Sequence, residues 1–176
     1  MSALCEIHMD FQLRDQTIFA VQAAIVELLE LAASLDRGGE SDLKESVLLD
    51  AEQTVLRFIA AIVVADGALS SDEREFLTLL LNTKEKPEGD CSYLNEFAAE
   101  WQERSSRVPD FFERAVKHDI VNKTTVARSM IREIQLIGNN ICACDSRFGK
   151  REQSVVRNYI SKLADFVDMA TAPTRF

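Results

Sequence analysis

Residues 55–81 read VLRFIAAIVVADGALSSDEREFLTLLL, and this stretch decides the fold. Apolar side chains recur at helical steps of three and four up to Ile62, and Asp66-Gly67 then breaks the pattern. Residues 70–73 (SSDE) have the S-x-x-E spacing of a capping box, which starts a second helix. The stretch therefore predicts a helix, a short acidic loop and a second helix.

The rest of the chain shows the same helical periodicity. Six glycines and three prolines in 176 residues are too few turn formers for a β-sandwich or barrel. We therefore expect an all-α fold of about seven helices in a single domain. Its predicted parts are an N-terminal helix at about 12–36, repeat one at about 41–82, connecting helices at about 91–118 and repeat two at about 122–168. The polar segment 82–90 is expected to be a surface loop.

The helix–loop–helix pattern occurs a second time, 79 residues further along the chain. Residues 137–160 read IGNNICACDSRFGKREQSVVRNYI, so that Asp145 falls on Asp66 and Glu152 falls on Glu73. Cys142 falls on apolar Val63, which predicts a buried cysteine. Similar helical hairpins commonly pack about a twofold axis. We expect two helical hairpins in pseudo-twofold packing, with an added N-terminal helix.

These two stretches resemble the signatures of the tellurite-resistance TerB-like family. An apolar helix that ends in A-D-G, a short turn and a helix with a glutamate near its start match the first signature. Residues 137–160 resemble its degenerate second copy, with Cys144-Asp145-Ser146 in place of A-D-G. The resemblance covers roughly residues 15–167. It implies an all-helical, cytoplasmic, non-catalytic protein of bacterial stress or phage resistance that acts within larger, sometimes membrane-linked, complexes.

The resemblance also implies a divalent-cation site, of the calcium or magnesium class. Carried over by position, its candidate ligands are Asp66 and Glu73 in the first copy and Asp145 and Glu152 in the second. Calcium takes six to eight oxygen ligands, so either copy alone supplies too few carboxylates. A site pooled across the pseudo-twofold axis would have four, enough for a hard cation with additional waters.

A purely architectural role for the same loops is the alternative. Asp66 can hydrogen-bond the backbone of its own turn, Gly67 can supply a positive φ, and Glu73 can complete the capping box. The charged residues around the loops are candidate interaction residues, and these are Asp72, Arg147, Lys150 and Arg151. The basic ones could neutralise the second loop internally and so oppose a cation site.

Charge and composition restrict the partners and the compartment. The net charge of −9 argues against a nucleic-acid partner, and it divides into −13 over residues 1–100 and +4 over residues 101–176. Four cysteines are too few for a disulfide scaffold. The first residues do not have the pattern of a signal peptide, and the longest unbroken apolar run, residues 58–65, is far shorter than a membrane span. We expect a soluble, cytoplasmic protein, with any membrane link made through a partner.

Two hypotheses for the function follow. The first is a non-catalytic TerB-like module that binds a cation or docks in a larger assembly. The second is a structural or interaction protein that pairs with itself or a partner, with residues 12–35 as its binding arm. No nucleophile–base arrangement or glycine-rich phosphate loop is readable, so we predict no enzyme; hydrolysis by a carboxylate-bound metal would be the enzymatic alternative.

Overall fold

The fold is built from helices alone across the part of the chain that the computed structural model describes, which is residues 3–35, 41–65, 67, 71–80, 92–144 and 149–172. In these ranges the elements are α1 (Ala3–Ser34), α2 (Ser41–Val63), α3 (Ser71–Leu80), α4 (Ser92–Arg104), α5 (Asp110–Asn122), α6 (Val126–Cys144) and α7 (Lys150–Thr171). The prediction of an all-α fold of about seven helices is confirmed. The polar segment 82–90 lies outside the described residues.

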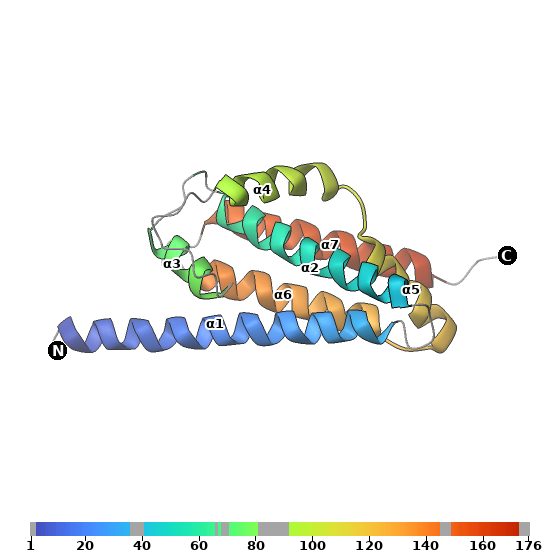
Figure 1. Ribbon diagram of the computed structural model, residues 1–176, viewed down its shortest axis with the longest axis horizontal. Helices are drawn as coiled ribbons and strands as arrows, with labels where there is room; N and C mark the ends of the chain where they lie inside the picture. Colours follow the sequence, from blue (N-terminus) through green and yellow to red (C-terminus); the bar gives the residue numbers. More distant parts are fainter. Residues whose placement is uncertain are drawn as a thin grey trace.

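Helices α1, α2, α6 and α7 run along the long axis of the molecule (Figure 1). Helix α6 packs between α1 and α7, and α2 contacts all three of these helices. Helix α4 covers the outer side of α2, while α5 packs against α6 and α2. The short helix α3 lies against α1, where the side-chain Nε2 of Gln22 donates a 3.1 Å hydrogen bond to the carbonyl oxygen of Leu80.

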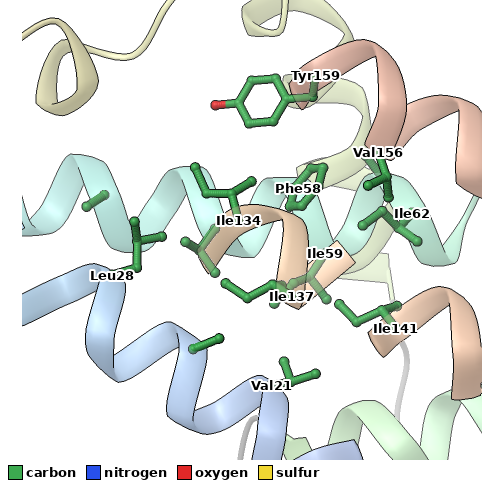
Figure 2. Close-up of a cluster of buried hydrophobic side chains, with 14 of the residues drawn as sticks. Val21, Leu28, Phe58, Ile59, Ile62, Ile134, Ile137, Ile141, Val156 and Tyr159 are labelled. Carbon is green, nitrogen blue, oxygen red and sulfur yellow. The ribbon is translucent and has the colours of Figure 1, made fainter. Parts of the chain in front are cut away.

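The core forms where the apolar stripes of the four long helices meet (Figure 2). The cluster drawn there contains Val21 and Leu28 of α1, Phe58, Ile59 and Ile62 of α2, Ile134, Ile137 and Ile141 of α6, and Val156 and Tyr159 of α7. Burying each large aliphatic or aromatic side chain contributes roughly 1.5–3 kcal/mol, so this cluster is the main source of stability. The buried thiol of Cys142 confirms the prediction from its place in the repeat.

A glycine sets the spacing between two of these helices. A Cβ atom added to Gly138 of α6 would lie 2.8 Å from both methyl carbons of Val156 on α7 and 3.2 Å from Cζ of Phe58 on α2. No side chain fits in this space, so the backbone of α6 can approach its neighbours closely. Glycine costs a helix interior about 1 kcal/mol relative to alanine. Tight packing at this crossing offsets that cost.

The two predicted repeats share a pattern of burial but differ in their packing. Helices α3 and α7 begin at residues 71 and 150, the same 79-residue offset seen in the sequence. Phe58 and Ile137 are both buried, and so are Leu77 and Val156. Helix α7 packs along α6, whereas α3 makes its contacts with α1. Length contributes to this difference, because α7 has 22 residues and α3 has 10.

Helix α1 begins at Ala3, ahead of the start expected near residue 12. Its apolar stripe, which includes Ile18, Val21, Leu28 and Ala32, faces the bundle, where α6, α2 and α3 of the same chain cover it. The segment Asp15–Ser34 has the length and mean hydropathy, 1.6, of a helix that could cross a membrane. Core helices of soluble proteins and signal sequences pass the same test, so one such helix is weak support for a membrane span.

The start of α6 is fixed by a side chain of the preceding helix. The carboxylate of Asp119 in α5 accepts 2.8 Å hydrogen bonds from the backbone N–H groups of Val126 and Ala127, and a 2.5 Å bond from the Thr124 hydroxyl. A negative charge at a helix N-terminus also interacts favourably with the helix dipole. Asp119 therefore caps α6 from outside that helix and couples it to α5.

Candidate functional site

Most of the residues predicted for the acidic loops lie outside the described part of the structure. Asp66, Asp145 and Arg147 lie in loops outside the described residues, so whether the two loops approach one another stays a prediction. Asp72 and Glu73 lie in the first turn of α3, and their side chains are outside the description. Gly67 between α2 and α3 has a φ of 90°, which is the left-handed conformation that the architectural interpretation requires of a glycine.

Glu152 is the member of the predicted ligand set whose side chain is described. It is the third residue of α7 and is 4% exposed. Its carboxyl carbon lies 3.2 Å from the point where a Cβ atom of Gly149, the N-cap residue, would sit. A carboxylate that folds back on the first turn is favoured by the helix dipole. This position supports an architectural role for Glu152.

A buried thiol and two exposed basic side chains lie near Glu152 in the structure or the sequence. Burial and then the nearby charge of Glu152 raise the pKa of the Cys142 thiol to about 11. Lys150 and Arg151, the described members of the predicted interaction set, have exposed side chains. Among the described side chains, no three histidine, cysteine or acidic groups lie together as a metal site would require. The divalent-cation site therefore stays a prediction that depends on loop residues outside the described part of the chain.

A pocket of about 430 Å³ lies where α2, α4, the α4–α5 connection and α7 meet. Its volume is within the range of about 300–1,000 Å³ typical of small-ligand sites. Buried side chains form its inner end, and exposed charged side chains surround its mouth. The lining residues are Asp50, Thr54, Arg57, Trp101, Glu103, Arg104, Ser105, Arg107, Val108, Pro109, Asp110 and Tyr159.

Two aromatic rings border the inner end of the pocket. Trp101 and Tyr159 are in edge-to-face contact, with ring centroids 4.6 Å apart, and each ring centroid lies 5.3 Å from that of Phe58. Tyr159 is 4% exposed, and its hydroxyl has no hydrogen-bond partner among the described groups. Leaving a buried polar group unpaired costs about 1–3 kcal/mol, and native structures do so rarely. This hydroxyl is therefore a buried donor that a ligand or water could satisfy.

Fixed polar contacts hold the walls of the pocket in place. The Arg57 side chain is 10% exposed and donates from Nε to Oε2 of Glu100 at 2.6 Å. Asp50 accepts a 3.0 Å hydrogen bond from the backbone N–H of Phe111, near the start of α5. Lys162 of α7 donates to the backbone carbonyl oxygens of Ser105, at 2.5 Å, and Arg107. These bonds attach the α4–α5 connection and the α5 N-terminus to α2 and α7.

Burial shifts the pKa values of two groups in this region. Burial, followed by the charge of Asp50, raises the pKa of Tyr159 well above its usual range, so the phenol keeps its proton. Desolvation lowers the pKa of Lys162. Tyr159 is therefore a hydrogen-bond donor at every physiological pH.

Two features of the sequence point to this pocket, although helical periodicity alone does not reveal them. Asp50, Thr54 and Arg57 follow one another at steps of four and three, which places them on one face of α2 beside the apolar stripe. Tyr159 falls within the apolar stripe of α7, where the hydroxyl is the one feature that distinguishes it from its neighbours. Partners from α4 and the following connection could not be read from the sequence, because tertiary packing brings them there.

A second feature is the outer face of α1. Phe19 is 73% exposed and Val26 is 55% exposed, and the exposed Ala23 lies between them on the same side of the helix. Asp15, Gln16, Glu27 and Glu30 are exposed around this stripe. Residues 15–34 contain three acidic side chains and no lysine or arginine. The outer face of α1 is therefore apolar at its centre and acidic at its edges.

Comparison of the chain with protein-family models, with curated protein sequences and with solved structures finds no match. The TerB-like resemblance consequently rests on the two stretches of sequence that carry it.

Proposed function

We propose that this chain is a non-catalytic docking module of a larger assembly, and that its partner is a basic amphipathic helix that packs on the outer face of α1. This extends the function implied by the TerB-like resemblance, a cytoplasmic stress-response module. The exposure of Phe19 and Val26 on a helix whose opposite side packs against the bundle is the observation that carries the proposal. Large exposed apolar side chains that lie together on one face are typical of protein interaction sites.

The shape of the face favours a helix as the partner. Phe19, Ala23 and Val26 are spaced four and three residues apart, which is the spacing with which one helix meets another. Ala23 has a small side chain at the middle of the stripe, so a partner backbone can come close there. A partner helix would place its own apolar residues between Phe19 and Val26.

Charge favours a basic partner over a second copy of the chain. Two copies of this face would bring Asp15, Glu27 and Glu30 of one chain near the same acidic groups of the other, with no basic residue in the segment to offset them. Like charges across an interface are costly, whereas complementary charges speed association and select partners. The same acidic edges oppose binding to an anionic membrane surface.

The proposal is tested with a synthetic peptide of leucine and lysine at helical spacing, labelled with fluorescein and followed by fluorescence anisotropy. We expect the double variant Phe19→Ser/Val26→Ser to bind this peptide at least about tenfold more weakly than the wild type. The reason is that burial of each side chain contributes roughly 1.5–3 kcal/mol and 1.4 kcal/mol corresponds to tenfold. Binding should also weaken as salt is added.

Matched controls distinguish binding at this face from non-specific hydrophobic binding. The variant Leu49→Ser/Leu136→Ser removes two exposed leucines, one from α2 and one from α6, and should bind as the wild type does. A leucine–glutamate peptide should not bind. Equal binding to both double variants, or binding of the acidic peptide, would overturn the proposal. If light scattering shows a dimer that the α1 variant dissociates, the partner is a second copy and the assignment of a basic helix is wrong.

A further inference from the structure

The pocket between α2, α4 and α7 has the features of a built binding site, separate from the outer face of α1. Thr54, Arg57, Trp101 and Tyr159 are all buried at its inner end, and they come from three different helices. Figure 2 shows the Tyr159 hydroxyl pointing away from the apolar cluster formed by Phe58 and its neighbours. Tyr159 lines the pocket, and its buried hydroxyl has no protein partner among the described groups.

The charges of the lining balance one another. Three carboxylates and three guanidinium groups face the pocket, and these are Asp50, Glu103 and Asp110 with Arg57, Arg104 and Arg107. Arg57 is already paired with Glu100. A strongly anionic ligand would meet the carboxylates, and a cation would meet the arginines. The lining therefore favours a ligand without net charge.

The hydrogen-bonding groups at the inner end specify the ligand further. Tyr159 keeps its proton and donates, while Asp50 accepts and has one oxygen engaged by the backbone N–H of Phe111. A ligand hydroxyl can accept from Tyr159 and donate to Asp50, because a hydroxyl group has both a donor and acceptor lone pairs. The indole of Trp101 and the half-buried Val108 and Pro109 add apolar surface against which a ring or carbon chain can rest.

We propose that this pocket binds a small neutral polyhydroxy compound of about monosaccharide size, held by hydrogen bonds to Tyr159 and Asp50 beside the ring of Trp101. The volume of about 430 Å³ accommodates such a ligand with associated water. The α4–α5 connection, which Lys162 attaches to α7, closes one side of the site.

Trp101 makes the test direct, because it is the single tryptophan of the chain and it lines the pocket. D-glucose, D-ribose and myo-inositol are titrated separately into the full chain while tryptophan fluorescence is recorded. We expect a saturable change with at least one of the three, together with a rise in Tm at the same concentrations, because a ligand specific to the native state stabilises it. Tyr159→Phe should weaken this binding by about tenfold, as expected for one lost hydrogen bond to the ligand.

The variant and its control keep the test falsifiable. Tyr159→Phe retains the ring that packs on Trp101 and Phe58, so it should fold with an unchanged or higher Tm. Ser161→Ala removes an exposed hydroxyl from the same helix and should bind as the wild type does. A response that never saturates, or one that is equal in the wild type and Tyr159→Phe, overturns the proposal. Saturable binding of glycine betaine without binding of any polyol also overturns it, since the ligand would then be a zwitterion.

Discussion

Replacing Gly138 by alanine tests whether the contact between α6 and α7 depends on a missing side chain. The new Cβ atom would lie 2.8 Å from both methyl carbons of Val156 and 3.2 Å from Cζ of Phe58. Carbon atoms pack best at about 3.5–4.0 Å, so the two helices must separate by about 0.7–1.2 Å or Val156 must leave its rotamer. Both methyl groups are equally close, so a simple rotation of Val156 exchanges one clash for another.

The size of the effect follows from two opposing terms. Overpacking a well-packed core costs about 1–3 kcal/mol, and the upper half of that range applies because atoms of two helices must move. Alanine has a better helix propensity than glycine, which stabilises the folded state by about 1 kcal/mol. We therefore expect Gly138→Ala to lower the free energy of unfolding by about 1–2 kcal/mol. In a protein of this size that lowers Tm by about 2–8 °C.

Urea unfolding followed by circular dichroism measures the effect, and a second variant isolates its cause. In a Val156→Ala background both offending methyl carbons are absent, so adding Gly138→Ala should be neutral or stabilising. Asn139→Ala, at the exposed neighbouring position, serves as the control for helix propensity alone. A higher Tm for Gly138→Ala alone, or the same loss in both backgrounds, would refute the close-packing argument.

Three further predictions concern the helix ends, the buried thiol and the loops. Asp119→Ala should cost about 2 kcal/mol and lower Tm by about 4–8 °C, because two N–H groups at the start of α6 lose their acceptor; Asp119→Asn, which keeps one oxygen, should lose less. Cys142 should resist alkylation in the native protein at neutral pH, as read by mass spectrometry. Since folding raises its pKa from 9.0 to about 11, its contribution to stability is complete below pH 9.0 and is lost as the pH rises towards 11. A cation site shared by the acidic loops predicts that millimolar calcium or magnesium raises Tm in the wild type and not in Asp66→Ala/Glu73→Ala; an unchanged Tm would remove that site.

Helical periodicity was sufficient to predict the class of fold and much of its core. Phe58 and Ile62 were expected on one stripe, Cys142 was expected to be buried, and all three are buried in the structure. These features follow from local spacing, since a residue three or four positions away lies on the same side of a helix. The order and approximate positions of the helices could be predicted for the same reason.

The orientation of α1 was harder to predict because apolar residues occur on both of its sides. The pattern from Ile18 to Ala32 identified the inner stripe, but it could not show that α6, α2 and α3 of the same chain cover it. Phe19 and Val26 would also be ordinary residues in a buried helix. Only the packing of α1 shows that their side chains are exposed to solvent. The sequence therefore suggested residues 12–35 as a binding arm, but it could not show which side of this helix stays exposed.

The pocket could not be predicted, because its groups come from distant parts of the chain. Asp50 lies on α2, Arg104 ends α4 and Tyr159 lies on α7. A one-dimensional pattern shows which side of each helix is buried, and it does not show which polar groups of different helices meet. The balance of charge in the lining therefore became visible only in three dimensions.

The packing of α1 against α6 has a consequence for the order in which the chain folds as it is made. Helix α1 leaves the ribosome before α6, and at roughly 5–20 residues per second the intervening chain of about ninety residues takes on the order of 10 s to synthesise. During that interval α2 covers only part of the inner stripe, so α1 presents apolar residues on both sides. Such a helix is a favoured substrate for holding chaperones and a point where nascent chains can associate. We therefore expect α1 to be the helix most prone to unwanted association until α6 has been synthesised.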